Sequence, residues 1–202
     1  VQVGASLVKA PSCGWATSWN DPSFRLAMYV VAASVPTAAM GLGLKDLIES
    51  QFANPGYVGL FLTVTGALLA LTLLRKNSTS TTQLTLGLAI LLGCVQGCAI
   101  LPGISRSGST IAVALLLGIA GKEAARFSFL MALPAISGAT LLSLRKLEET
   151  QLEYGVILIG FIAAGVSGWL ALKWFIPLVE KGRLHIFTPY VWAVACGVWL
   201  WM

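Results

Sequence analysis

Long apolar segments alternate with short polar ones along this chain. The segment from Phe24 to Leu44 is apolar apart from Arg25 near its start, and the segment from Tyr57 to Leu74 carries no charged side chain. The latter would be about 27 Å long as a helix, close to the roughly 30 Å hydrocarbon core of a bilayer. Three further apolar segments are Phe127 to Leu144, Tyr154 to Phe175 and Tyr190 to Met202. This pattern predicts an all-α polytopic membrane protein.

The composition agrees with the pattern. Of 202 residues, 57% are hydrophobic and 10% are charged, and the mean hydropathy is +0.84. Soluble domains carry roughly 25% charged residues, so the composition argues against a soluble protein. Asn54-Pro55-Gly56 has the composition of a turn between two spans, and no low-complexity stretch separates a second domain. Residues 1–202 are therefore interpreted as a single membrane domain.

The net charge of +5 bears on the partners of the chain. Its basic residues stand in ones and twos beside apolar segments and form no stripe, so we expect anionic membrane lipid rather than nucleic acid as partner. Four cysteines form no CxxC pair: Cys13, Cys94, Cys98 and Cys196. We expect them to be small buried hydrophobic residues, and they predict neither a metal site nor a disulfide.

Residues 84–120 differ from the other apolar segments because glycines and polar residues interrupt them. Leu84 to Leu101 is almost long enough to cross a membrane, whereas Thr110 to Ala120 has 11 residues and is too short at about 16 Å. Irregular backbone is not tolerated against lipid. We therefore predict a re-entrant helix-loop-helix over 84–120, with the loop 102–110 at its tip, inside the membrane and enclosed by protein.

The predicted hairpin also affects the orientation of the chain. If the hairpin returns to the side from which it entered, one group of basic residues shares a face, which the positive-inside rule makes cytoplasmic. This group comprises Arg25, Arg75, Lys76, Lys122, Arg126, Lys181 and Arg183. The opposite face would carry Lys45, Arg145 and Lys146. Two full crossings in place of the hairpin would change this assignment.

Arg106 is the only charged side chain between Lys76 and Lys122. A charge in an apolar segment costs about 2.5–3.5 kcal/mol on insertion scales unless something pairs with it. No Asp or Glu occurs between Glu49 and Glu123, so an anionic ligand is the natural partner. A guanidinium group suits phosphate because it binds two phosphate oxygens at once.

The neighbours of Arg106 suit the same chemistry. They are hydroxyl donors and glycines that permit close backbone approach: Ser105, Ser107, Ser109, Thr110, Gly103 and Gly108. A helix that begins near Ser109 or Thr110 would point its unpaired N–H groups and its positive dipole end at the same place. The loop from Pro102 to Thr110 therefore predicts a phosphate-binding site.

A second interpretation of these residues is purely structural. The serines and threonine would cap a helix after the Pro-Gly turn, and Arg106 would bond carbonyl groups of neighbouring helices or extend to water. Gly93 and Gly97 form a GxxxG pattern that favours close helix packing, and Gln96 between them suits a hydrogen bond between helices. His185 lies in a basic loop and is interpreted as a solvated histidine.

The stretch from Gly93 to Thr110, GCVQGCAILPGISRSGST, closely resembles the second signature of the bacterial undecaprenyl-diphosphate phosphatase family, also known as the bacitracin-resistance protein. The resemblance continues in FSFLMALP at 127–134, SGAT at 137–140 and GFIAA at 160–164. It covers the chain from about Phe24 to Met202. The string Pro-Gly-x-Ser-Arg-Ser-Gly-x-Thr is its most specific part.

The resemblance implies both a fold and an activity. The fold is an inverted-repeat helical bundle in which re-entrant hairpins meet at the centre. The activity is hydrolysis of undecaprenyl pyrophosphate to undecaprenyl phosphate and phosphate, which recycles the lipid carrier for cell-wall synthesis and gives bacitracin resistance. The location implied is the bacterial plasma membrane, and a homodimer is compatible with such a protein.

The same resemblance assigns roles to residues of the loop. Ser105, Arg106 and Thr110 match the catalytic positions of the family. Four further residues are expected to shape the loop and bind phosphate: Gly103, Ser107, Gly108 and Ser109. Gln96 is expected close to the substrate. A divalent cation, magnesium or calcium, is the cofactor that the resemblance implies.

One part of the family pattern has no counterpart in these residues. It is the first signature, a Glu-rich stretch followed by a Ser-Ser-x-Gly-His loop. We therefore expect a member truncated at its N-terminus, without the acidic ligands of the cation. An alternative function is then a lipid-phosphate binder or flippase, in which the same loop holds the headgroup near the membrane centre without hydrolysis.

Overall fold

The structure of the protein is a computed structural model, which describes residues 21–43, 55–74, 82–144 and 154–202. Regular secondary structure in these ranges is helical throughout. The α-helices are α3 (Pro22–Gly43), α5 (Pro55–Leu71), α6 (Leu86–Cys98), α7 (Arg106–Leu116), α8 (Gly121–Leu144), α9 (Tyr154–Glu180) and α10 (Thr188–Trp201). Two short 3-10 helices are η1 (Thr72–Leu74), which continues α5, and η3 (Leu184–Phe187), which precedes α10.

Five helical segments of the described chain are long and apolar enough to cross a membrane. They are Pro22–Gly43, Pro55–Leu74, Gly121–Ser143, Gly155–Glu180 and Leu184–Trp201. The prediction of an all-α polytopic membrane protein is therefore confirmed. α6 and α7 have 13 and 11 residues and are shorter than any of these spans.

Several helices extend beyond the predicted spans. α8 begins at Gly121 rather than at Phe127, and α9 continues past Phe175 to Glu180. The predicted ends followed the change from apolar to charged residues. Backbone hydrogen bonding does not stop at that change, because a helix keeps its own backbone hydrogen bonds in the polar headgroup layer of a membrane.

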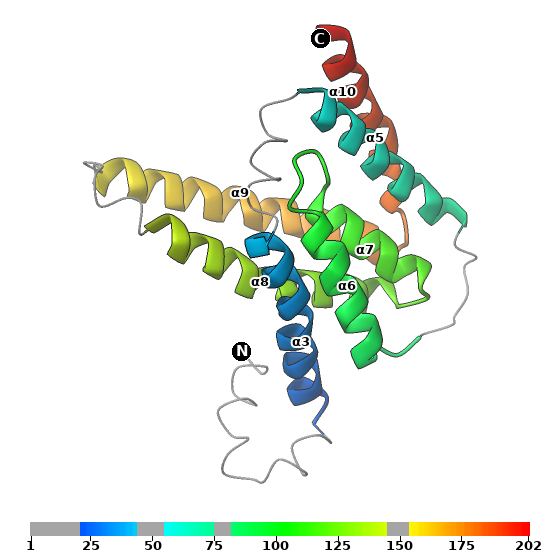
Figure 1. Cartoon of the computed structure of the whole chain (residues 1–202), viewed down its shortest axis with the longest axis vertical. Helices are drawn as coiled ribbons and strands as arrows, with labels where there is room; N and C mark the ends of the chain where they lie inside the picture. Colours follow the sequence, from blue (N-terminus) through cyan, green and yellow to red (C-terminus); the bar gives the residue numbers. More distant parts are fainter. Residues whose placement is uncertain (1–20, 44–54, 75–81, 145–153) are drawn as a thin grey trace.

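Figure 1 shows three groups of helices. α3, α6 and α7 lie at the centre, α5 and α10 lie side by side at one end, and α8 and α9 extend together to one side. α7 is the most enclosed, with seven of its 11 residues buried. The membrane-spanning part of α9, in contrast, has no buried side chain and presents apolar residues to its surroundings. α7 therefore lies within protein, whereas α9 is suited to contact with lipid.

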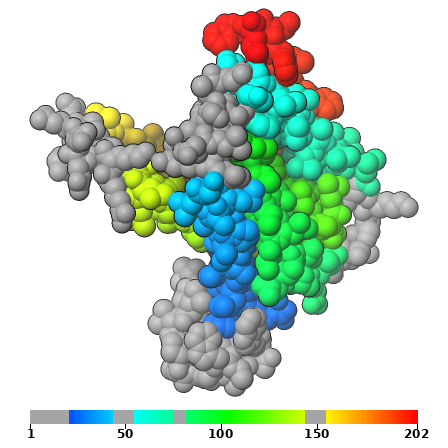
Figure 2. All heavy atoms as spheres, in the orientation of Figure 1, coloured from blue at the N-terminus to red at the C-terminus, as the bar shows by residue number. Residues whose placement is uncertain are grey.

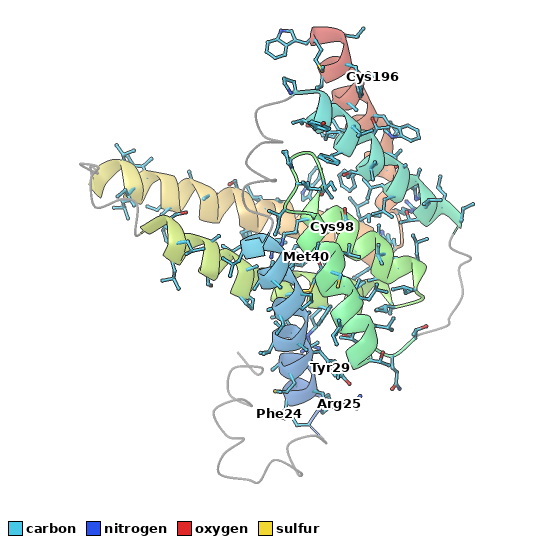
Figure 3. The ribbon with its side chains drawn as sticks, viewed as in Figure 1. Phe24, Arg25, Tyr29, Met40, Cys98 and Cys196 are labelled. Carbon is cyan, nitrogen blue, oxygen red and sulfur yellow. The ribbon has the colours of Figure 1, made fainter. Side chains whose placement is uncertain are left out.

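α3 and α6 approach each other closely through glycines of α6. A Cβ atom on Gly93 would collide with the backbone carbonyl of Ala33, and one on Gly97 would collide with Met40. Figure 2 shows α3 directly against α6, and Figure 3 labels Met40 and Cys98 where the two helices meet. The expectation that the GxxxG pattern packs against a helix is confirmed, because only glycine leaves room for this contact.

α5 and α10 form a second close pair. A Cβ atom on Gly59 would lie 3.1 Å from the indole of Trp199, and one on Gly66 would collide with the indole of Trp192. Trp192 Nε1 also donates a hydrogen bond of 3.3 Å to the carbonyl of Thr63. Two large rings of α10 thus occupy two gaps left by glycines of α5, which fixes the rotation of α5 about its axis.

The cysteines differ from the sequence-based expectation. Cys94, Cys98 and Cys196 are free thiols, but Cys98 and Cys196 are exposed and Cys94 is only partly buried. The expectation of buried cysteines was therefore wrong for these positions, because the apolar segments that contain them face outward as well as inward. Cys13 lies outside the described residues.

Candidate functional site

The candidate site lies in the break between α6 and α7. α6 ends at Cys98, and turns over residues 99–103 lead to Ser105. At the other end of the two helices, the amide of Thr82 donates a hydrogen bond of 3.1 Å to the carbonyl of Gly118. The chain therefore leaves this helix-loop-helix close to where it entered. Its re-entrant placement in the membrane stays a prediction.

α7 begins earlier than predicted. Ser105 is its N-cap, because the Ser105 hydroxyl accepts a hydrogen bond of 3.1 Å from the Gly108 amide, and Arg106 is the first helical residue. The expectation that the helix begins near Ser109 or Thr110 was therefore wrong. Serine is a strong N-cap, so the helix starts at the first serine that can satisfy an unpaired amide.

The loop before α7 is held on α5 by Thr65. The Thr65 hydroxyl donates to the carbonyl of Gly103 at 3.0 Å and accepts from the amide of Ser105 at 3.2 Å. Gly103 has φ +98°, which disfavours any side chain, and a Cβ atom there would lie 2.6 Å from the carbonyl of Val58. The glycine therefore permits both the turn and the close contact with α5.

Arg106 extends from the first turn of α7 toward α6 and α8. Its Nε donates a hydrogen bond of 3.0 Å to Oε1 of Gln96, and its Nη2 donates one of 3.4 Å to the carbonyl of Ala132. The side chain is partly buried and forms no ion pair with any residue that the structure describes. Nη1 and one N–H of Nη2 remain available for an anion.

Both sequence-based interpretations of the loop hold in part. Ser105 does cap a helix, and Arg106 does bond a carbonyl of a neighbouring helix, as the structural interpretation expects. The charge of Arg106 nevertheless has no carboxylate partner among the described residues. The amides of Arg106 and Ser107 also lie in the first turn of α7, where a helix offers no acceptor. The capacity to bind an anion therefore remains.

Ser109 and Thr110 lie on the inner side of α7, away from its exposed start. Thr110 is 1% exposed, and its hydroxyl lies 2.8 Å from the carbonyl of Arg106 and 2.6 Å from the hydroxyl of Ser128 on α8. Ser109 is buried as well, and its hydroxyl has no hydrogen-bond partner among the described residues. Thr110 thus connects α7 to α8. The catalytic role of Thr110 and the phosphate contact of Ser109 stay predictions.

The structure brings together a subset of the predicted residues. Ser105 is exposed, and Arg106 and Ser107 are partly exposed at the same end of α7. Gly108 is buried beneath Ser105, since a Cβ atom on Gly108 would lie 2.7 Å from the Ser105 hydroxyl. The accessible part of the site therefore consists of one guanidinium, two hydroxyls and the first amides of α7.

This donor set does not suit the divalent cation that the resemblance implies. Magnesium and calcium bind oxygen ligands, carboxylates above all, and Arg106 would repel them. No group of three His, Cys, Asp or Glu side chains in the described ranges can hold a metal ion. Five of the eight acidic residues lie outside those ranges: Asp46, Glu49, Glu148, Glu149 and Glu153. The described residues around the loop therefore do not form a site for a divalent cation.

Three residues around the site were missed in the sequence. Thr37 contacts Gln96, Thr65 holds the loop, and Ser128 contacts Thr110. Each is a small polar residue in an apolar segment, and only its burial distinguishes it from the other serines and threonines of these segments. His185 differs from its prediction, because it is partly buried and its Nδ1 has no partner among the described residues.

Comparisons with known proteins match most of this chain, including the residues of the loop. The family described as Bacitracin resistance protein BacA matches residues 4–197. An undecaprenyl-diphosphatase of Methanobrevibacter smithii is 42% identical over 186 residues, which cover 90% of this chain and 67% of that protein. One of Desulfosudis oleivorans is 46% identical over 181 residues, covering 88% of this chain and 65% of that protein.

A further undecaprenyl-diphosphatase, from Desulfatibacillum aliphaticivorans, is 39% identical and covers 91% of this chain and 66% of that protein. The chain thus spans about two thirds of the length of these relatives. The family match covers nearly the whole chain, including the loop, both helices that flank it, four of the five apolar spans and most of the fifth. The chain belongs to the bacitracin resistance protein BacA family.

Proposed function

We propose that the protein takes part in hydrolysis of undecaprenyl pyrophosphate, releasing phosphate and leaving undecaprenyl phosphate. The observation that carries this proposal is Arg106, a cation without a carboxylate partner among the described residues, at the start of an enclosed helix. The names of the relatives, undecaprenyl-diphosphatase, support the choice of substrate. Bacitracin resistance would follow from the same activity.

In this proposal the loop binds and orients the terminal phosphoryl group. Nη1 and Nη2 of Arg106 bind two of its oxygens, while the amides of Arg106 and Ser107 donate to the same group. The Ser105 oxygen already accepts from Gly108, so its proton is free to be donated to the phosphoryl group. The P–O anhydride bond then breaks, the phosphoryl group passes to water, and the lipid phosphate leaves. Charge that develops in the transition state is stabilised by groups already in place.

The apolar spans support a location in the membrane. The five apolar spans keep the chain in a membrane, where its lipid substrate also resides. We place it in the bacterial plasma membrane, with the hairpin of α6 and α7 entering from one side. The described residues around the loop offer no ligands for a divalent cation, so a cation takes part in this proposal only through ligands from other residues.

We also propose that the protein forms a homodimer.

The test is phosphate release from undecaprenyl pyrophosphate by the purified protein in detergent, beside an Arg106→Ala variant. Loss of one preorganised charge that stabilises a transition state costs about 100- to 1000-fold in rate. Arg126→Ala is the matched control, because Arg126 is exposed and its nearest carboxylate, that of Glu123, is 4.0 Å away on the same helix. Near-normal release by the Arg106→Ala variant would refute the assignment.

The flippase alternative predicts a different result once the purified protein is reconstituted in proteoliposomes. A protein that only moves the lipid would transfer labelled undecaprenyl pyrophosphate across proteoliposomes without releasing phosphate. The five spans are compatible with either function, and only the release of phosphate separates them. We prefer hydrolysis because the relatives that resemble this chain are named for it.

A further inference from the structure

Gln96 and Ala132 bond one edge of the Arg106 guanidinium, the edge formed by Nε and Nη2. Oε1 of Gln96 accepts from Nε of Arg106, at the base of the guanidinium, at 3.0 Å. The edge formed by Nη1 and the outer N–H of Nη2 has no hydrogen-bond partner among the described residues, and it can bind two phosphate oxygens. The bond to Gln96 therefore occupies the inner edge and directs the outer edge away from α6.

The orientation of the Gln96 amide is itself determined by its neighbours. Its Nε2 lies 3.3 Å from the Thr37 hydroxyl and 3.3 Å from the carbonyl of Met131. A carbonyl can only accept and an arginine can only donate. If the amide were reversed, its NH₂ group would face the N–H of Arg106 and its oxygen would face the Met131 carbonyl. Only one orientation satisfies all partners.

Thr37 completes this arrangement from α3. Its single hydroxyl proton is directed to the carbonyl of Gly93 at 2.8 Å or that of Ala33 at 3.1 Å. Its oxygen is consequently left to accept from Gln96. The close contact between Gly93 and Ala33 brings these groups within reach, so the packing of α3 on α6 sets the position of the hydroxyl.

α8 supplies the acceptors on the other side. Gln96 binds the carbonyl of Met131, and Arg106 binds that of Ala132. Both carbonyls lie on the turn of α8 just before Pro134. Gln96 is 1% exposed and Thr37 is 5% exposed, so a lost partner here could not be replaced easily by water.

We infer that Thr37 and Gln96 form a positioning relay that holds the guanidinium of Arg106 in the orientation that binds the pyrophosphate of the lipid substrate. The relay rests on the proposed function, since it acts on the substrate only through Arg106. The relay extends the site from the loop to α3. In these hydrogen bonds Thr37 of α3 reaches Arg106 only through Gln96.

Binding of undecaprenyl pyrophosphate in detergent tests the relay without requiring turnover. Gln96→Met keeps the length of the side chain but removes its amide, and we expect Kd to rise about 10- to 100-fold, the range for a hydrogen bond to a charged group. Thr37→Val should raise Kd by a smaller factor. Thr37→Ser keeps the hydroxyl and should bind within twofold of the unmodified protein.

A double-mutant cycle distinguishes positioning from a general structural effect. Lys has no Nε–H to bond Gln96, so in an Arg106→Lys background the Gln96→Met change should alter Kd less than twofold. If Gln96→Met weakens binding by the same factor in both backgrounds, the relay is refuted while the proposed function stands. If Arg106→Lys and Arg106→Ala bind and react like the unmodified protein, the proposed function itself fails. Thermal unfolding in detergent confirms that each variant is folded.

Discussion

Thr65 on α5 donates a hydrogen bond of 3.0 Å to the carbonyl of Gly103, 38 positions later in the chain. The same hydroxyl accepts from the amide of Ser105, so a single side chain holds both ends of the turn before α7. The phosphate loop is therefore not a free connection between two helices. The shape of the loop depends on α5, a helix that supplies no group to bind the anion.

Replacement of Thr65 by valine removes both bonds while keeping the shape of the side chain. We expect the free energy of unfolding to fall by about 1–3 kcal/mol, because two partly buried hydrogen bonds, each worth about 0.5–1.5 kcal/mol, are lost. Phosphate release should fall at the same time, since Ser105 is no longer held. Thr63→Val is the control, because the Thr63 hydroxyl binds only a carbonyl of its own helix. Equal stability of the two variants would contradict this role of Thr65.

Gly103→Ala should destabilise the protein more than an ordinary glycine substitution. The positive φ of +98° and the carbonyl of Val58, 2.6 Å from the new Cβ atom, both oppose it, at a cost of about 1–3 kcal/mol. Gly87→Ala on α6 meets nothing within 4 Å and should be neutral or slightly stabilising. Thermal unfolding in detergent compares the two. A Gly103→Ala protein as stable as the Gly87→Ala protein would show that the turn is not as tight as described.

A charged substitution at position 105 distinguishes the two roles of Ser105, which are to cap the helix and to contact the phosphate. Asp at position 105 can still accept from the Gly108 amide, and its charge suits a helix N-terminus. Ser105→Asp should therefore unfold at a higher temperature than Ser105→Ala, which loses about 1 kcal/mol. Binding of undecaprenyl pyrophosphate should nevertheless be lost in Ser105→Asp, because a second anion is repelled. Retained binding in that variant would place the phosphate elsewhere.

The contact between α3 and α6 should be equally sensitive. Gly93→Ala places a methyl group against the backbone of Ala33, which cannot move as a side chain can, and overpacking of this kind costs about 1–3 kcal/mol. Gly138→Ala is the control on α8, where the added methyl group meets nothing within 4 Å. Unfolding temperatures in detergent measure the difference. If both variants behave alike, α3 and α6 are not in the close contact described.

Much of this arrangement was predictable because it depends on rare residues. A lone arginine in an apolar segment, a Pro-Gly turn and a GxxxG pattern each stand out from their surroundings, and Arg106, Gly103 and Gly93 were identified in this way. The break between two short helices follows from the same signals. The glutamine between the two glycines was also correctly expected to bond another helix.

The remaining parts of the site have no such signal. Thr37 and Thr65 look like any other threonine in a membrane helix, where the hydroxyl commonly bonds a carbonyl of the preceding turn. Their contacts join segments 59 and 38 positions apart, and no local spacing predicts which threonine reaches which partner. The start of α7 was misplaced because several consecutive hydroxyl residues can all serve as a cap. The structure selects Ser105, whose amide Thr65 already binds.

The pairing of α5 with α10 has a consequence for how the protein is made. Trp192 of α10 packs against Gly66, which is next to Thr65, and α10 follows every other described helix in the chain. During biosynthesis α5, α6 and α7 therefore leave the ribosome well before the helix that fixes the rotation of α5. A nascent chain that stops before Trp192 would carry the whole Pro-Gly-Ile-Ser-Arg-Ser-Gly-Ser-Thr string while α5, which holds that loop through Thr65, still lacks its contact with α10.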